Sequence, residues 1–218
     1  MSEKKIAVIL SGCGVYDGSE IYESTLVLLA LDQANIGYQC MAPNKEQMHV
    51  INHLTGEVSG ESRNVLVEAA RLARGEIIDL ATANPDDYDG LIFPGGFGAA
   101  KNLSTFAVDG SSMTIDADVS QFAKAMRSAN KPIGLVCIAP ALAPLLFGEG
   151  TECTIGSDAD TAAAITAMGG KHINCGVTEI HVDNERKIVT TPAYMLAGRI
   201  SEAAAGITKL VQRVVEML

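Results

Sequence analysis

Cys137 is the side chain whose surroundings most favour nucleophilic chemistry. It directly follows a short apolar run at residues 133–136 and is followed by small and turn-forming residues. A nucleophile at a sharp turn from strand to helix takes a strained backbone, so its neighbours must be small, as Gly134 and Ala139 are. The free N–H groups of a helix that starts near Pro140 would favour the thiolate, the reactive form of cysteine. The alternative is a buried core cysteine, which is what most cysteines are.

A second candidate is the glycine-rich stretch FPGGFG at residues 93–98. Consecutive glycines after a strand allow backbone N–H groups to face a ligand, and loops at the carboxyl ends of strands line the site of a doubly wound sheet. We expect the N–H of Gly95 or Gly96 to form an oxyanion hole together with the N–H of Ile138. A tight turn from strand to helix, without a ligand, is the open alternative.

The third candidate is Glu23, on the apolar face of a helix predicted over residues 20–35. It shares that face with Val27 and Ala30, and an acid there needs a partner or a raised pKa. A neutral Glu beside a thiolate can act as a general acid and base. The alternative is an acid that only complements the helix dipole, a role that Glu20 fits better.

Two further patterns do not support a bound cofactor. The glycines at 12, 14 and 18 are spaced one residue too widely for the dinucleotide fingerprint, and the second strand does not end in an acid. His49 and His53 are four residues apart, as a metal pair on a helix would be, but their neighbours favour strand and turn and no third ligand is evident. We therefore expect neither a cofactor nor a metal.

The elements that must position these groups alternate between strands and helices. Apolar runs predict strands at 6–10, 38–42, 91–93 and 133–136, and two short ones at 180–182 and 187–190. Helical periodicity and breakers predict helices at 20–35, 64–74, 116–129 and 161–168, and a largely helical end at 193–218. Residues 49–61 are expected to form an irregular excursion or hairpin. Right-handed βαβ units and a mostly parallel sheet follow, in one domain over residues 1–218.

Composition limits the partners and the compartment. The formal net charge of −10 argues against nucleic acid or an anionic membrane as partner, and no segment approaches the ~20 apolar residues of a membrane span. The five cysteines include no C-x-x-C pair, so neither a zinc knuckle nor a disulfide framework is expected. A reducing compartment, the cytoplasm, is the simplest interpretation.

Longer blocks of the sequence resemble a known family. The segment DYDGLIFPGG at 87–96, together with GLVC at 134–137, is similar to the ThiJ/PfpI, class I glutamine amidotransferase-like superfamily. The ElbB branch, the enhancing lycopene biosynthesis proteins, is resembled more closely still, over the blocks 9–21, 50–57, 95–104 and 189–197. These blocks extend over nearly the whole chain.

The resemblance implies a flavodoxin-like three-layer α/β sandwich with a nucleophile elbow, and a homodimer. It implies Cys137 as the elbow nucleophile and Glu23 as the carboxyl group beside it. Members of this branch are described as cofactor-free, glutathione-independent glyoxalases, so the implied substrate is a small aldehyde, glyoxal or methylglyoxal. They are also linked to isoprenoid biosynthesis.

One departure from the superfamily bears on the reaction. Many members carry a His at the end of the strand that follows the Cys, whereas residues 153–158 read CTIGSD here. A Cys–His dyad for glutamine hydrolysis is therefore in doubt, because that reaction must protonate departing ammonia. An aldehyde reaction expels no amine, so Cys137 and Glu23 can suffice. The alternatives are a redox-sensing or regulatory protein with an oxidisable Cys137, and a glutaminase subunit of an amidotransferase.

Overall fold

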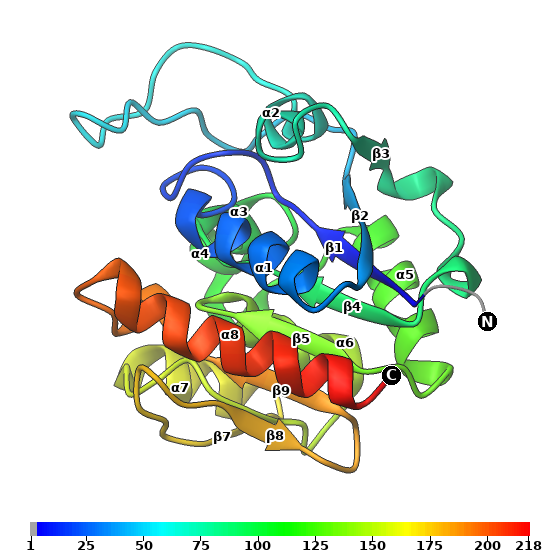
Figure 1. Cartoon of the computed structure of the whole chain (residues 1–218). Helices are drawn as coiled ribbons and strands as arrows, with labels where there is room; N and C mark the ends of the chain where they lie inside the picture. Colours follow the sequence, from blue (N-terminus) through cyan, green and yellow to red (C-terminus); the bar gives the residue numbers. More distant parts are fainter. Residues whose placement is uncertain (1–3) are drawn as a thin grey trace.

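A seven-stranded sheet forms the centre of the computed structural model, which describes residues 4–218. The order of its strands is β3-β2-β1-β4-β5-β9-β8 (Figure 1), and all neighbours are parallel except β8 and β9. The strands are β1 (Lys5–Ile9), β2 (Gly37–Ala42), β3 (Ile77–Asp79), β4 (Gly90–Phe93), β5 (Ile133–Val136), β8 (His181–Asp183) and β9 (Ile188–Thr191). A separate parallel pair joins β6 (Glu152–Cys153) to β7 (Lys171–His172). The mostly parallel sheet predicted from the sequence is thus confirmed.

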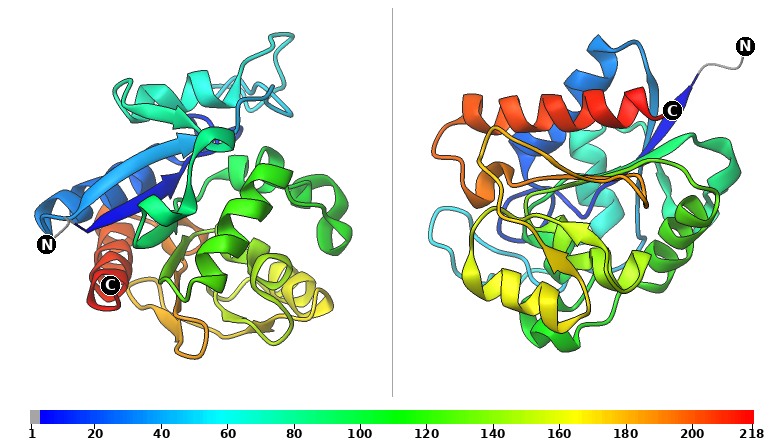
Figure 2. Two further views of the ribbon diagram at one scale, coloured as in Figure 1. Left: turned by 90° about the vertical axis from the view of Figure 1, so that its right-hand side faces the viewer. Right: turned by 90° about the horizontal axis from the view of Figure 1, so that it is seen from below.

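Helices cover both faces of this sheet, as the two views of Figure 2 show. One layer consists of α1 (Ile21–Gln33), α2 (Val65–Leu72) and α8 (Ile200–Glu216). The opposite layer contains α5 (Ala117–Ser128), α6 (Ala143–Phe147) and α7 (Ala159–Ala167). The arrangement is the flavodoxin-like three-layer sandwich that was expected. No helix within residues 4–218 is both long and apolar enough to cross a membrane.

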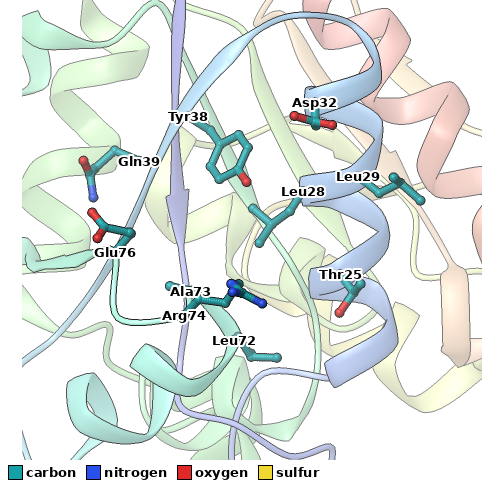
Figure 3. A pocket seen from close by; sticks show the side chains of 10 residues that line it. All are labelled: Thr25, Leu28, Leu29, Asp32, Tyr38, Gln39, Leu72, Ala73, Arg74 and Glu76. Atoms are coloured by element: carbon teal, nitrogen blue, oxygen red, sulfur yellow. The ribbon is translucent and has the colours of Figure 1, made fainter.

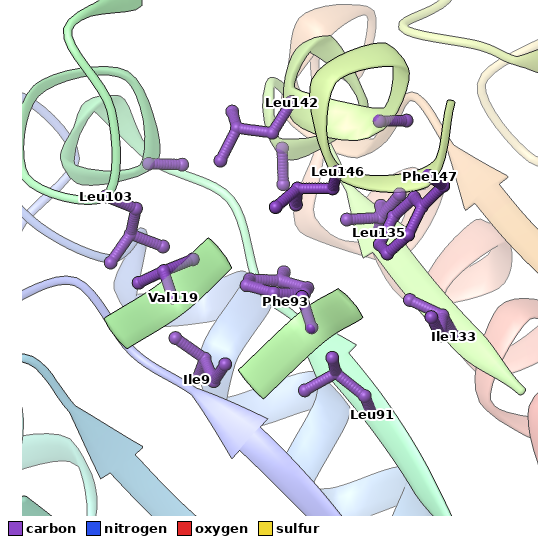
Figure 4. Packing of buried hydrophobic residues seen from close by; sticks show 14 of the residues in the cluster. Ile9, Leu91, Phe93, Leu103, Val119, Ile133, Leu135, Leu142, Leu146 and Phe147 are labelled. Carbon is purple, nitrogen blue, oxygen red and sulfur yellow. The ribbon is translucent and has the colours of Figure 1, made fainter. Parts of the chain in front are cut away.

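The central strands are apolar on both sides because both sides are covered. Ile9, Leu91 and Phe93 point into one core, where they meet side chains of α5 and α6 such as Val119 and Leu146 (Figure 4). Side chains at alternate positions of the same strands, such as those at 6, 8 and 92, enter the second core beneath α1 and α8. This double burial fixes the strand ends, and with them the loops that carry the site.

Several elements differ from the prediction, among them β6 and β7, which were not expected. The edge strand β3 was missed, because its three half-buried residues make no apolar run. The helical end is interrupted: a 3-10 turn, η5 (Ala193–Met195), precedes α8, which begins only at Ile200. The segment after Cys137 begins with the 3-10 turn η4 (Ala139–Leu142) before the short α6. Residues 49–61 are irregular as predicted, with one antiparallel bridge between Ile51 and Val58.

Candidate active site

Cys137 lies at a sharp bend between β5 and η4. Its φ is 63°, in the left-handed region that a non-glycine residue rarely adopts. The bend is held because the Cys137 N–H donates to Thr191 O of β9 at 3.0 Å. The side chain is 7% exposed, between the two helical layers. The sharp bend predicted at Cys137 is therefore present, and its role as a nucleophile stays a prediction.

Gly95 brings Cys137 and Glu23 together from opposite sides. A Cβ at Gly95 would overlap both Cys137 Cβ and Glu23 Oε2, and it would lie 2.9 Å from Val136 O. The glycine is needed for this close approach, since any side chain would separate the acid from the thiol. Its N–H lies near the Glu23 carboxyl group and lowers the pKa of that group, and the oxyanion role considered for Gly95 stays a prediction.

Glu23 is fully buried in the first turn of α1. Its Oε1 accepts from the Tyr194 N–H at 3.1 Å, whereas its Oε2 is buried without a nitrogen or oxygen partner in the described chain and faces the thiol. Burial, together with a smaller contribution from the neighbouring charge of Glu20, raises the pKa of Glu23 to about 8. Glu23 is therefore largely neutral at pH 7 and can donate as well as accept a proton.

Glu20 caps α1, at the helix end where an acid complements the helix dipole, the role considered for it from the sequence. Its side chain accepts from the Glu23 N–H at 2.6 Å, at the N-terminus of α1. Its own N–H donates to Gly95 O at 2.9 Å. Glu20 thus fixes the start of the helix, and Glu23 alone is directed at the sulfur.

The expected thiolate is not the resting form of Cys137. Burial raises the pKa of its thiol well above the ordinary value, and the Glu23 charge raises it further. The expectation of an ionised sulfur was wrong because a 3-10 turn and a five-residue helix provide only a weak dipole, which desolvation outweighs. The resting pair is a neutral thiol beside a buried acid.

Two backbone N–H groups converge on the sulfur. Those of Gly96 and Ile138 lie near it and oppose the rise in its pKa. Gly96 has a φ of 98° and precedes α3 (Phe97–Lys101). Donors in these positions can stabilise negative charge that develops near the sulfur during a reaction.

The glycines at 12, 14 and 18 have a packing role. The loop that carries them lies against the 95–98 turn, backbone to backbone, with the Phe97 N–H donating to Val15 O at 2.8 Å and the Gly98 N–H to Gly18 O at 2.9 Å. A Cβ at Gly18 would overlap the backbone of Cys13. Gly18 thus permits the tight course of its own loop, whereas Gly96 and Gly98, whose Cβ atoms would overlap the Gly18 backbone, permit the two loops to touch beside the site.

A pocket of about 410 Å³ opens over Cys137. Its walls are mostly apolar, and none of the residues that line it is a Lys, Arg or His, among residues 4–218. The lining residues are Val15, Gly96, Phe97, Ala100, Phe106, Ala107, Cys137, Ile138, Asp158, Thr161, Tyr194 and Met195. Sequence reasoning missed Phe106, Met195 and the Tyr194 amide, since none of them belongs to a motif with a chemical role.

No histidine lines the described pocket, and the 153–158 segment contributes only Asp158 to its lining. In the 153–158 segment, Gly156 faces the Leu196 side chain. His172 lies on β7, where its Nε2 accepts from the Ile155 N–H at 3.3 Å. His53 stacks on Tyr16 and accepts from its N–H at 3.2 Å, in an irregular loop. Within residues 4–218, no three potential ligands gather as a metal site requires.

A larger hollow, of about 930 Å³, lies elsewhere, between α1, β2 and α2 (Figure 3). Leucine and tyrosine side chains share it with charged ones such as Asp32 and Arg74. It contains neither Cys nor His in the described chain. The smaller pocket over Cys137 is therefore the candidate active site.

Comparison with known proteins identifies relatives over nearly the full length. The chain is 48% identical to human "glutamine amidotransferase-like class 1 domain-containing protein 3, mitochondrial", over 98% of this chain and 83% of that protein. Identity to the rat "ES1 protein homolog, mitochondrial" is also 48%, over 98% and 84%. The crystal structure of an "isoprenoid biosynthesis protein with amidotransferase-like domain" from Ehrlichia chaffeensis superposes with a TM-score of 0.92 at 37% identity, covering 98% and 99%. No family model matches the chain.

The chain therefore belongs to the ThiJ/PfpI, class I glutamine amidotransferase-like superfamily, in its ElbB-type branch. The crystal structure of glyoxalase III from Candida albicans shares the fold, with a TM-score of 0.61, at only 12% identity. The likeness to that enzyme concerns the fold alone.

The expected cytoplasmic location is contradicted by these relatives. The human and rat proteins are both named as mitochondrial, which points to the mitochondrion instead. The prediction rested on five free cysteines. Free thiols indicate a reducing compartment, but they do not distinguish the cytoplasm from the mitochondrial matrix.

Proposed function

We propose that the protein is a cofactor-free, glutathione-independent glyoxalase that converts glyoxal or methylglyoxal to the 2-hydroxy acid. One observation carries this proposal: a buried carboxyl oxygen without a nitrogen or oxygen partner faces a buried thiol at an elbow. An acid at this position can accept a proton from the thiol and later move a proton on the bound substrate. Conversion of a 2-oxoaldehyde to the 2-hydroxy acid expels no amine, so no group is needed to protonate one.

The first step is addition of Cys137 to the aldehyde. In the minor fraction of molecules in which Glu23 is ionised, its carboxylate accepts the thiol proton as the sulfur bonds to C1, and the C=O π electrons move onto oxygen. The N–H groups of Gly96 and Ile138 stabilise this oxyanion. Glu23 returns the proton to the oxygen, which gives a neutral hemithioacetal and leaves Glu23 as a carboxylate.

The second step moves hydrogen between the two carbons. Glu23 removes the proton from C1, the electron pair forms a C1–C2 double bond, and the C2 carbonyl becomes an enol oxygen. The C1 hydroxyl passes its proton to the C2 oxygen, and Glu23 protonates C2 as the C1 oxygen becomes a carbonyl. The product is a thioester of Cys137 with the 2-hydroxy acid, formed without an external oxidant or reductant.

Water completes the reaction by attack on the thioester carbonyl. The C–S bond breaks, the acid leaves, and the sulfur recovers its proton. The net change is addition of one water to the 2-oxoaldehyde. Both carbons change oxidation state within the same molecule, so no cofactor is required.

The two alternatives have less support. A redox sensor needs an exposed thiol with a lowered pKa, whereas burial raises the pKa of Cys137 and leaves the residue 7% exposed. A glutaminase needs a base for ammonia and a cation for the glutamine carboxylate. Neither a His nor a Lys or Arg lines the pocket in the described chain.

The implied homodimer is also a proposal. The first helix carries apolar side chains that are exposed in the single chain, Tyr22 at 52% and Leu29 at 46%, and a second copy would cover such residues. We expect light scattering of the purified protein to give the mass of two chains.

Turnover by the purified protein tests the proposed function. Metal-free, thiol-reduced wild type is expected to form glycolate from glyoxal and lactate from methylglyoxal, and Cys137→Ala is expected to form neither. Cys175→Ala, which changes a half-buried cysteine outside the pocket, should retain the wild-type rate. Equal rates in wild type and Cys137→Ala would overturn the proposal.

A further inference from the structure

The pocket over Cys137 is larger and more apolar than glyoxal requires, and we infer that it selects 2-oxoaldehydes with an uncharged, apolar substituent of several carbons. This inference rests on the proposed function and specifies its substrate class. Phe106, Met195 and Ile138 are the residues that would contact the substituent.

Size is the first argument. The pocket measures about 410 Å³, within the ~300–1,000 Å³ of pockets that enclose drug-sized ligands. Glyoxal and methylglyoxal have two and three carbon atoms, so either leaves most of this volume unfilled. A substituent on C2 can extend away from Cys137 into the remaining space while C1 stays at the sulfur.

The lining chemistry is the second argument. Phe106, Ile138 and Met195 are half-buried and pack with the apolar core, so they present fixed apolar surface to the pocket. Phe106 begins α4 (Phe106–Asp109), which packs beside α3. Apolar surface of this kind stabilises an apolar substituent that moves out of water into the pocket. A two-carbon aldehyde has no such substituent and gains nothing comparable.

Charge is the third argument. Asp158 is the only ionisable carboxyl group that lines the described pocket, and no cation accompanies it. Lys101 lies nearby on α3, but its ammonium donates to Tyr16 O at 2.7 Å and does not line the pocket. An anionic substituent would therefore meet a carboxylate and no counter-charge, so the pocket should disfavour it.

A homologous series of substrates tests the inference. We would measure kcat/KM for methyl-, propyl- and pentyl-substituted 2-oxoaldehydes, whose reacting carbons are alike. Each buried methylene should raise kcat/KM about fourfold until the chain reaches the pocket mouth. A flat or falling series, with methylglyoxal still turned over, overturns this inference and leaves the proposed function standing. Absence of turnover with every member overturns both.

Variants locate the effect in the pocket. Phe106→Ala is expected to lower the ratio of kcat/KM for the pentyl to the methyl substrate, and Met195→Ala provides the same test if the first variant folds poorly. Val108→Ala, two residues along α4, exposed by 68% and outside the pocket, is the matched control and should keep the wild-type ratio. An unchanged ratio in both pocket variants would contradict the assignment.

The charge argument has its own pair of substrates. Phenylglyoxal should be converted several-fold faster than 4-carboxyphenylglyoxal at equal concentration, below KM. Asp158→Asn retains the helix cap, because the amide oxygen can still accept from the Thr161 N–H, and it should narrow this difference. Faster conversion of the carboxylated substrate by wild type would overturn the stated preference for uncharged substituents.

Discussion

At the scale of single residues, the site is a thiol and a carboxyl group kept out of water together. In the resting state Cys137 is a neutral thiol and Glu23 is largely protonated, because burial raises the pKa of both. The types and places of both residues were predictable, since a Cys after a buried strand and a Glu on an apolar helix face are visible in the sequence. Their protonation was not, because it depends on how completely the fold excludes water.

The assignment of Glu23 as the acid and base leads to a prediction with a built-in comparison. Glu23→Gln should lower kcat/KM by about 10²–10⁴-fold, the usual contribution of such a group. Glu20→Gln should cost far less, because an amide oxygen can still accept from the Glu23 N–H. Steady-state kinetics on both variants measure this, and equal losses would refute the roles given to the two acids.

A second prediction concerns the space at Gly95. Gly95→Ala should destabilise the fold by about 1–3 kcal/mol, because the new methyl group overlaps Cys137 and Glu23, and it should abolish turnover. Gly60→Ala is the control: its Cβ would meet nothing within 4 Å, so we expect a change within about 0.5 kcal/mol. Urea unfolding of the two variants measures the change in the free energy of unfolding. Similar midpoints for both would show that the contact at Gly95 is not tight.

At the scale of elements, the site depends on two loops that touch through glycines. The order of strands and helices was predictable because apolar runs and breakers mark it, and so was the bend after β5. The contact between the 12–18 loop and the 95–98 turn was not, because no local pattern shows which distant backbone a glycine will face. For the same reason, the glycine spacing argued against a dinucleotide fingerprint without revealing which backbone these glycines contact.

Asn102 offers a test of this loop contact. It is 1% exposed, and its amide donates to Ser11 O and Asp17 O, both at 2.8 Å, while its Oδ1 accepts from the Met48 N–H at 2.9 Å. Asn102→Ala leaves these buried groups unpaired and should cost about 3 kcal/mol of stability, with a lower kcat because the loop leads into α1.

The control for this variant is Asn174→Ala, at an exposed position. It should leave the stability of the protein nearly unchanged. Thermal unfolding and turnover of the two variants are the measurements. A wild-type melting temperature for Asn102→Ala would mean that its three hydrogen bonds do not hold the loops.

At the scale of the whole molecule, folding brings residues 23, 95, 137 and 194 from four distant segments to one point. The layered architecture followed from periodicity and from the family resemblance. The compartment did not follow from the sequence, because free thiols indicate a reducing environment and do not identify the compartment that provides it. The pocket shape was also hidden, since Phe106 and Met195 belong to short turns without a distinctive pattern.

A buried acid with a raised pKa should make the stability of the whole chain depend on pH. The pKa of Glu23 is about 8 when folded against 4.5 as its ordinary value, so the folded state holds more protons in this window and stability falls as pH rises through it. Glu23→Gln removes this dependence. Its stability relative to wild type should rise by on the order of 3 kcal/mol between pH 5 and pH 8.

Urea unfolding at the two pH values measures this change. Glu57→Gln, on the exposed hairpin, is the control and should follow wild type. A constant difference between Glu23→Gln and wild type at both pH values would show that the carboxyl group titrates normally.

The most direct test of the account is to trap methylglyoxal on the sulfur. Wild type and Glu23→Gln would be mixed with methylglyoxal, quenched in acid and digested for mass spectrometry. The hemithioacetal and the thioester are isomers, so either adds the mass of one methylglyoxal to the Cys137 peptide. We expect this adduct on Cys137, and none at that peptide in Cys137→Ala. Turnover to lactate without any adduct on Cys137, or with equal labelling of all five cysteines, would contradict covalent catalysis at the elbow.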